Sequence, residues 1–426
     1  MSDGLNNEAV VSMEARVGSA GIEAPHTLQD LDIRRSLVQD LALKILYMQG
    51  ELLLVNLADQ MRLSLGIVNE VFEYLRKEQL CEVKGMIGGM YRVATTSLGN
   101  ARAREVLELS HYAGPAPISL EEYVRQVHAQ SVRNISFHPA DVEKAFHHLV
   151  FPRLTLTQLG IAIVSGHSIL LHGPPGTGKT AVAETIAGIS QGSVWIPHAI
   201  EVASQIITVF DSYLHEPSDE PIGEQTDRRW VRCRRPRVIA GAELKLEMLD
   251  LQFNPAGRYY SAPLQMKANN GVLIVDDFGR QQTRPEDVLN RWMAPLDHKT
   301  DYLTLAGGRR FSIPFDSFVV FVTNLEKLMD EAFLRRIQTK VRLDYATSQE
   351  FHEIFRRVCA ESDLPYDAAV VDELISFLER SGRPLRPCDP GEIALHILRG
   401  AAYEDRPPRF DSASVAQACR NYLISA

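Results

Sequence analysis

Apolar residues recur at helical spacing between residues 31 and 78 of the chain. This spacing predicts three helices, over residues 31–48, 54–61 and 64–78. Two short segments rich in β-forming residues, 81–86 and 90–95, follow on either side of two glycines and predict a β-hairpin. The first part of the chain should therefore fold as a small α+β unit.

The apolar positions of two of these helices can be named. Leu37, Leu41, Ile45 and Met48 recur at helical spacing in the first helix, and Ile67, Val71, Phe72 and Leu75 are expected to face inward in the third. Gly50 should end the first helix, and Ser64 should cap the N-terminus of the third.

The order of three helices and a hairpin resembles a winged helix-turn-helix module, which we expect over residues 27–112. Such modules often bind DNA with the third helix. The polar and charged side chains on that helix are mixed and do not form a basic surface: Asn69, Glu70, Glu73, Arg76, Lys77 and Glu78. A protein-docking or packing role is therefore favoured over DNA binding.

Strand and helix signals alternate in the middle of the chain, and only helix signals remain at its end. Residues 173–324 predict a parallel sheet flanked by helices, an α/β fold. The helices predicted outside this stretch are 98–109, 120–130, 140–150, 154–165, 348–362, 366–380, 390–403 and 412–423. The expected division is a mobile tail (1–26), the winged-helix-like domain (27–112), a linker with a connecting helix (113–139), the α/β domain (140–345) and a helical domain (346–426).

Composition narrows the class of protein. The 426 residues carry a formal net charge of −9, which argues against non-specific binding to nucleic acid or to anionic membranes. The five cysteines are scattered and form no C-x-x-C pair, so we expect reduced thiols and no structural zinc. The N-terminus lacks the features of a signal peptide, and no apolar run approaches the length of a membrane span. We expect a cytoplasmic protein without membrane insertion.

One stretch of the α/β region carries a complete phosphate-binding motif between an apolar strand signal and a helix signal. It matches G-x-x-x-x-G-K-[ST] at Gly173, Pro174, Pro175, Gly176, Thr177, Gly178, Lys179 and Thr180, and Ala181 follows it at the start of the helix. The glycines let backbone N–H groups turn toward phosphate oxygens, and the helix N-terminus favours the same anion. Lys179 is expected to reach the β- and γ-phosphates, and the Thr180 hydroxyl to bind Mg²⁺. The motif therefore predicts a nucleotide site.

Two acids end the apolar strand predicted at 271–275. They emerge at the carboxyl edge of the sheet, beside the phosphate loop. Asp276 is the candidate for holding Mg²⁺, and Asp277 is the candidate general base that activates water. A second apolar strand, 318–322, leads to Asn324, which could hydrogen-bond the water or the γ-phosphate; a simple turn residue is the alternative.

Taken together, these motifs resemble the AAA+ ATPase family. The resemblance covers roughly residues 120–426 and includes the run 330–337 and the helical C-terminal region. It implies ATP and Mg²⁺ as ligands, a helical lid and a ring of subunits, usually six, with ATP at each interface. Arg336, or its neighbour Arg335, matches the arginine finger that acts on the neighbouring subunit's γ-phosphate. Arg386 matches the second sensor, with Arg383 as the rival.

The chain departs from the family pattern at one catalytic position. The family usually has Asp-Glu at the strand end, whereas this chain has Asp276-Asp277, whose second carboxylate is one methylene shorter. A misplaced base slows chemistry, so slow turnover is expected.

A hairpin is predicted over 302–313 around Gly307-Gly308, just before the sensor strand. It resembles a hairpin that one branch of the family places there and often points at the central pore. A purely structural packing role is the alternative.

A second charged feature is a run of six arginines around Trp230. The arginines are Arg228, Arg229, Arg232, Arg234, Arg235 and Arg237. They could bind nucleic acid, another anionic partner or a neighbouring subunit. The alternative is a solvated hairpin whose arginines pair with Asp219, Glu220, Glu224 and Asp227.

The sequence therefore supports two main hypotheses. The first is an ATP-hydrolysing AAA+ protein that remodels or regulates a protein partner as an oligomeric ring. The second is a DNA-binding regulator controlled by nucleotide, using the winged-helix-like module and the arginine run. A nucleotide-gated scaffold with negligible turnover is a weaker third.

Overall fold

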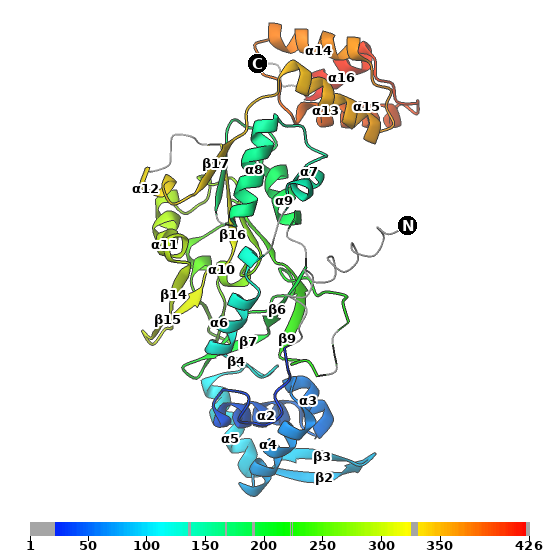
Figure 1. Ribbon diagram of the computed structural model, residues 1–426. Helices are drawn as coiled ribbons and strands as arrows, with labels where there is room; N and C mark the ends of the chain where they lie inside the picture. The colour runs from blue at the N-terminus through cyan, green and yellow to red at the C-terminus, as the bar shows by residue number, and fades with distance from the viewer. Residues whose placement is uncertain are drawn as a thin grey trace, which may run out of the picture.

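The structure is a computed structural model that describes residues 22–134, 138–166, 168–189, 192–221, 223, 225–324 and 331–422. Figure 1 shows an elongated molecule with the N-terminal helices at one end, two sheet regions in the middle and the C-terminal helices at the other end. None of the described helices has the length and apolar character needed to cross a membrane.

The N-terminal unit packs four helices against a small antiparallel sheet with the strand order β1-β3-β2. The Ser64 hydroxyl accepts a hydrogen bond from the Ile67 amide, as expected of an N-cap, and the predicted inward residues of the third helix are buried. The elements are α2 (Arg35–Gln49), β1 (Leu52–Leu53), α3 (Leu54–Met61), α4 (Leu65–Lys77), β2 (Cys81–Ile87), β3 (Met90–Thr95) and α5 (Ser97–Leu109).

The apolar stripe of α2 is only partly buried. Met48 is 59% exposed, whereas Leu41 and Ile45 are buried. The buried face of α2 ends at Leu46, and the last turn before Gly50 extends into solvent. Helical spacing therefore identified the apolar face of α2, but it did not show at which residue the neighbouring segments stop covering that face.

The central sheet has five parallel strands in the order β10-β13-β16-β5-β17 and confirms the predicted α/β class. Its three inner strands, β13, β16 and β5, are buried apolar runs, as expected for strands covered on both faces, whereas the edge strands β10 and β17 are partly exposed. Helices α7, α8 and α9 cover one face, and α11 covers the other (Figure 1). The elements are α7 (Pro139–Ala145), α8 (Arg153–Ser165), β5 (Ile169–His172), α9 (Lys179–Ile189), β10 (Arg237–Ala240), β13 (Val272–Val275), α11 (Pro285–His298), β16 (Phe318–Thr323), α12 (Glu331–Leu334) and β17 (Thr339–Arg342).

Helix α7 ends at Ala145, although the sequence predicts a helix to residue 150. Phe146 is buried and begins a turn that leads toward Pro152. The apolar spacing continued past the helix because the turn residues also contribute to the core.

A second sheet region, which the sequence did not predict as a separate unit, lies between the central sheet and the N-terminal unit. It comprises a five-stranded sheet in the order β11-β12-β8-β7-β4 and the pairs β6-β9 and β14-β15, all packed around one apolar cluster. The elements are β4 (Ile118–Ser119), α6 (Leu120–Ala129), the 3-10 turn at Val132–Asn134, β6 (Ser193–Pro197), β7 (Ala199–Val202), β8 (Gln205–Thr208), β9 (Trp230–Arg234), the 3-10 turn at Leu246–Leu249, β11 (Gln252–Asn254), β12 (Tyr259–Ser261), α10 (Leu264–Lys267), β14 (Thr300–Thr304) and β15 (Arg310–Pro314).

The expected linker is part of this packed structure. Strand β4 pairs with β7, and Ala116 is buried with its amide bonded to the Met61 carbonyl. At the other end of the expected tail, Glu23 forms an antiparallel bridge with Thr226. The earlier part of that tail, residues 1–21, lies outside the described residues. The prolines around 115–117 thus mark irregular backbone rather than a spacer.

The C-terminal domain consists of four helices around one apolar core, close to the bounds that the sequence predicts. Thr347 and Glu350 form a capping box at the start of the first of them. The helices are α13 (Ser348–Glu361), α14 (Ala368–Arg380), α15 (Asp389–Tyr403) and α16 (Ser412–Tyr422).

Candidate active site

The phosphate-binding motif forms a loop between β5 and α9, as its strand and helix signals predict. Gly173, Gly176 and Gly178 have φ values of 135°, 82° and 83°, a region that residues with a Cβ rarely adopt. A Cβ on Gly173 would also lie 2.1 Å from the Leu343 carbonyl oxygen. The loop therefore needs glycine for its backbone conformation and for its close approach to the end of β17.

Lys179 lies inside this loop with only 5% of its surface exposed. Its ammonium donates hydrogen bonds to the carbonyls of Gly173 and Pro174, at 3.0 and 2.6 Å, and to the Thr177 hydroxyl at 3.3 Å. The loop carbonyls hold the cation where the surrounding backbone can also face a phosphate.

Thr180 and Asp276 meet at the carboxyl edge of the central sheet, although 96 positions separate them in the sequence. The Thr180 hydroxyl lies 3.2 Å from one carboxylate oxygen of Asp276 and 3.4 Å from the other. Hydroxyl and carboxylate oxygens are donors that suit Mg²⁺, which in nucleotide sites takes its other ligands from phosphate and water. The pair fits that ion, and no described cluster of three His, Cys, Asp or Glu residues offers an all-protein metal site.

The two other predicted catalytic side chains also meet at this edge. The Asn324 amide donates to a carboxylate oxygen of Asp277 at 3.1 Å across neighbouring strands β13 and β16. Asp277 has a φ of 48°, a left-handed conformation that Asp tolerates better than most residues. Its amide donates to the Asp276 carboxylate at 2.8 Å. The turn thus orients both acids toward one place.

Gln281 stabilises this turn and was missed by the sequence reasoning. Its side-chain amide donates to the carbonyls of Asp276 and Asp277 at 3.0 and 3.3 Å, while its oxygen accepts from the Gly279 amide at 2.7 Å. No motif marks a glutamine at this spacing, so only the fold could identify it.

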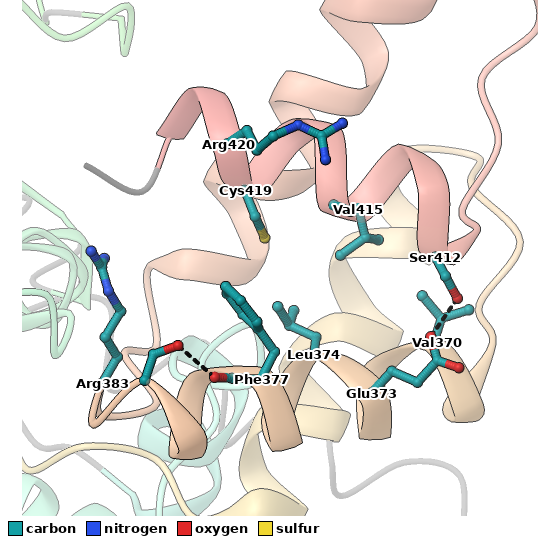
Figure 2. A pocket seen from close by; sticks show the side chains of 11 residues that line it. Val370, Glu373, Leu374, Phe377, Arg383, Ser412, Val415, Cys419 and Arg420 are labelled. Carbon is teal, nitrogen blue, oxygen red and sulfur yellow. Dashed lines mark hydrogen bonds between the residues drawn. The ribbon is translucent and has the colours of Figure 1, made fainter. Parts of the chain in front are cut away.

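Arg386 lies against the phosphate loop, but Arg383 lies elsewhere. A Cβ placed on Gly176 would come within 3.2 Å of the Arg386 side chain and 2.9 Å of the Cys388 sulfur. The Cys388 amide also donates to the Gly176 carbonyl at 3.2 Å. Arg383 instead lines a groove between α14 and α16 (Figure 2). Of the two sensor candidates, Arg386 is the one beside the loop.

The candidate finger residues are held by acids of their own chain. The Arg336 guanidinium lies 2.8 Å from Asp297 at the end of α11, and Arg335 lies 2.7 Å from Glu331. Arg336 is the less exposed of the two.

A hollow of about 120 Å³ adjoins the phosphate loop at Thr177. Its walls come from the lead-in to α8, the end of β17 and the loop before α15, and they include Phe151, Pro152, Tyr345 and Pro387. Flat apolar and aromatic groups beside a phosphate loop suit a nucleotide base. Because the walls come from distant segments, spacing along the sequence could not assemble them.

The hairpin β14–β15 forms as predicted and packs on one face. Leu303 and Ile313 are buried in the second sheet region, whereas Tyr302 is on the other face with the Arg310 guanidinium 4.4 Å above its ring. The tip around Gly307 and Gly308 is exposed. The hairpin is anchored to the sheet and presents an aromatic-cation pair to solvent.

The arginine run is not a solvated hairpin, because its strands pair with different partners: β9 with β6, and β10 with β13. The most deeply buried arginine, Arg229, contacts Asp227 at 2.7 Å and Glu122 at 3.4 Å. The other ion pairs of the run among the described residues are Arg228–Asp59, Arg232–Glu220, Arg234–Glu216 and Arg234–Asp219. Pairing was the predicted alternative and holds for three of its four acids; Glu224 lies outside the described residues.

Arg235 has a partly buried side chain and, unlike Arg229 and Arg232, forms no ion pair with an acid among the described residues. It donates to the carbonyls of Gln130 and Asn270, and no described hydrogen bond reaches its Nε. Burial lowers the pKa of this guanidinium to about 10, so it remains charged at neutral pH.

Comparison with known proteins gives two family matches. Residues 152–215 match the model of magnesium chelatase, subunit ChlI, and residues 347–421 match a domain of unknown function, DUF8689. No curated protein matches the chain. Among solved structures, the RuvB Holliday junction branch migration motor of Thermotoga maritima is similar at 14% identity, covering 65% of this chain and 71% of that chain, with a TM-score of 0.38. NtrX from Brucella abortus in complex with ATP is similar at 13% identity, covering 74% of this chain and 62% of that chain, also with a TM-score of 0.38.

The ChlI match spans the lead-in helix, the phosphate loop and α9, the elements on which the site is built. The same core has a parallel sheet whose strand ends bring Asp276, Asp277 and Asn324 together beside that loop. Over residues 152–215 the nucleotide-binding core is therefore similar to the magnesium chelatase subunit ChlI family, in keeping with the AAA+ resemblance of its motifs.

Proposed function

We propose that the chain binds ATP with Mg²⁺ and hydrolyses it to ADP and phosphate. The observation that carries this proposal is the meeting of Thr180, Asp276, Asp277 and Asn324 at the sheet edge beside the phosphate loop. Each pair comes from segments far apart in the sequence, and hydrolysis needs these groups together.

The phosphate loop accounts for binding in this proposal. The loop amides and Lys179 face the β- and γ-phosphates, while Thr180 and Asp276 hold Mg²⁺, which neutralises phosphate charge when it is bound. Arg386 approaches the same phosphates from the lid, and the hollow beside Thr177 receives the base.

Asp277 and Asn324 account for the chemical step. Asp277 accepts a proton from water as the water oxygen bonds to the γ-phosphorus, and the bond from that phosphorus to the bridging oxygen of ADP breaks. The hydrogen bond from Asn324 to Asp277 supports a role for Asn324 in holding the base and the water in line.

The test separates binding from turnover with two variants. Lys179→Ala should lose ATP binding, and Asp277→Asn should retain ATP within about threefold while its turnover falls at least a hundredfold, because only the latter removes the base alone. Binding is measured with a fluorescent ATP analogue and turnover by phosphate release. Unchanged hydrolysis in both variants would refute the proposal, and undetectable hydrolysis by the unaltered chain at high concentration would favour the nucleotide-gated scaffold.

The proposal extends to assembly. A ring, of six subunits by family resemblance, would let Arg336 act on the neighbour's γ-phosphate after leaving Asp297. Arg336→Ala should then retain ATP binding but lose turnover, and a small amount of Asp277→Asn chain, which still carries Arg336, should restore part of its activity. Arg335→Ala is the matched control. Equal effects of the two substitutions would contradict the assignment to Arg336.

The work of the ring in this proposal is to remodel or regulate a protein partner in the cytoplasm, with the N-terminal unit recruiting that partner. Free thiols at all five cysteines are compatible with a reducing compartment. The second candidate is a DNA-binding regulator. The acid partners of Arg228, Arg229, Arg232 and Arg234 weaken it, because paired guanidiniums offer less charge to phosphates.

A further inference from the structure

A groove of about 490 Å³ lies between α14 and α16 in the C-terminal domain, outside the nucleotide site. Figure 2 shows apolar side chains from both helices facing the space between them. Val370 and Leu374 form the wall on α14, Val415 and Cys419 form the wall on α16, and Phe377 stands at the rim with 47% of its surface exposed. This α14–α16 groove falls within the stretch that matches a domain family of unknown function.

The lining residues of the groove recur at helical spacing on both helices. On α14 the lining residues are four and seven positions after Val370, and on α16 they are three and seven positions after Ser412. The groove residues Val370, Leu374, Val415 and Cys419 belong to the same apolar core as Val371 and Ile375 and are at most 7% exposed. The groove is therefore lined by the edge of the domain core, and Phe377 is a lining residue whose apolar side chain extends into solvent.

The helical walls of the groove also favour a ligand with a helical backbone over one with an extended backbone. Both walls are helices, whose backbone groups are already hydrogen-bonded internally, so an extended peptide would find no partners for its own N–H and C=O groups. A helix satisfies those groups itself and needs only apolar contacts. The lining runs from Val370 to Ser381, which corresponds to roughly 16 Å of helix, or three turns.

Charge distinguishes the two ends of the groove. Arg383 and Arg420 lie at one end, and Glu373, the only acid among the described lining residues, lies at the other, where it accepts a hydrogen bond from the Ser412 hydroxyl at 2.5 Å (Figure 2). The Arg420 guanidinium at that end favours a carboxylate there. In a chain of net charge −9, this local positive end attracts an acidic ligand against the background field.

We propose that the α14–α16 groove binds an amphipathic helix of a partner protein, with an apolar face against Leu374, Phe377 and Val415 and acidic residues at the end that meets Arg420. The groove is thus a second recognition site on the chain. It rests on the geometry of the C-terminal domain and not on ATP turnover.

Three synthetic peptides of fourteen residues test this proposal on the full chain without nucleotide. All carry leucines at i, i+3, i+4 and i+7; one ends in glutamates, one ends in lysines, and one has the glutamates and a central proline. Fluorescence anisotropy should show the glutamate-ended helix binding at least tenfold tighter than either of the others. Equal affinity for the three peptides, or no binding of the glutamate-ended one, would overturn the proposal.

Variants on the chain locate the binding. Phe377→Ala, at an exposed rim position that should tolerate it, should weaken binding about tenfold, since a buried aromatic anchor is lost. Arg420→Glu should weaken the glutamate-ended peptide at least tenfold and improve the lysine-ended one. Arg380→Glu makes the same change of charge on α14 outside the groove lining and should stay within twofold. Equal effects of Arg420→Glu and Arg380→Glu would refute the assignment of the acidic end.

Two further chains separate other outcomes. Lys179→Ala should bind the glutamate-ended peptide as the unaltered chain does, so loss of nucleotide binding and loss of peptide binding are independent results. Removal of residues 1–21 or 423–426 should leave the affinity within twofold. A gain of more than tenfold on either removal would show that the chain's own end occupies the groove and would overturn a partner helix as its occupant.

Discussion

The phosphate edge of the central sheet and the arginine run from Arg228 to Arg237 are both charged stretches that stand out in the sequence, yet the fold uses them differently. At the sheet edge, Asp276, Asp277 and Asn324 remain together beside the phosphate loop. In the arginine run, Arg229 is buried on Asp227, and its neighbours pair with acids from other segments. One cluster is arranged for a ligand, and the other is mostly neutralised within the protein.

The phosphate-site motifs and the arginine run differ in how closely their sequence patterns are tied to a backbone structure. A phosphate loop and a strand-ending acid are defined by backbone context, since the strand, the turn and the helix fix where the side chain points. A run of charge has no such context, and its partners are chosen by whichever segments fold against it. A charge run therefore indicates function only after the fold has shown which of its members lack a partner.

The largest effect on the arginine side of this comparison is expected from Arg229→Ala. The side chains of Arg229 and Asp227 are 2% and 1% exposed, so removal of the arginine leaves a buried carboxylate without its cation. We expect a loss of about 3–5 kcal/mol in the free energy of unfolding, measured by urea denaturation. Arg228→Ala is the control and should cost less than about 1 kcal/mol, because its pair with Asp59 is exposed. The double variant Asp227→Asn/Arg229→Met should recover much of the loss; no recovery would mean that packing, and not charge, sets the cost.

The stability of the protein should also depend on pH through His198, which lies beside the arginine run, and this effect should be of intermediate size. Burial and Arg62 lower the pKa of His198, next to Arg229, from 6.5 to about 4. Between these values the unfolded chain binds a proton that the folded chain does not, so stability should fall as the pH drops from 6.5 to 4, by on the order of 2 kcal/mol. His198→Phe should flatten this dependence, measured by the fluorescence of Trp195 and Trp230, which pack in the same cluster. His111→Phe, at an exposed position, should leave it unchanged; the same slope in both variants would contradict the assignment.

On the phosphate side, Asp277→Glu tests whether the short base limits turnover. Glutamate adds the methylene that the family usually has, so under the proposed function the rate of phosphate release should rise severalfold. The left-handed backbone at this position, with φ of 48°, should cost glutamate on the order of 1 kcal/mol or less of stability. Asp276→Glu is the matched change at the metal-holding acid and should lower turnover. A fall in turnover for Asp277→Glu would show that the turn is built for the shorter side chain.

The smallest effect is expected from neutralising exposed members of the arginine run. Arg234→Gln/Arg237→Gln should change the free energy of unfolding by less than about 1 kcal/mol, because exposed charges contribute little. Retention on duplex DNA at low salt should be weak for both the unaltered chain and this variant. Strong, salt-sensitive retention that the variant loses would break the comparison and support the DNA-binding candidate.

The accuracy of the sequence predictions depended on the range of the interactions involved. The bounds of α3 and the four C-terminal helices followed from caps, glycines and apolar spacing, which act within a few turns. Met48 and the second sheet region were not foreseen, because the cover over a helix end and the pairing of short strands such as β4 and β11 depend on distant segments. Gln281 belongs with them, since its role comes only from the turn it closes.

By itself the sequence determined the class of the fold, the position of the phosphate loop and the acids and amide at the ends of its neighbouring strands. These features are encoded locally: glycines permit the loop, apolar runs make the strands, and a side chain that follows a parallel strand must emerge at one edge. The tertiary structure alone decided that Arg386 lies beside Gly176, that Gln281 ties the acidic turn, and that most of the arginine run is paired. Those outcomes depend on which surfaces meet, and hydrophobic packing settles that only when the whole chain has folded.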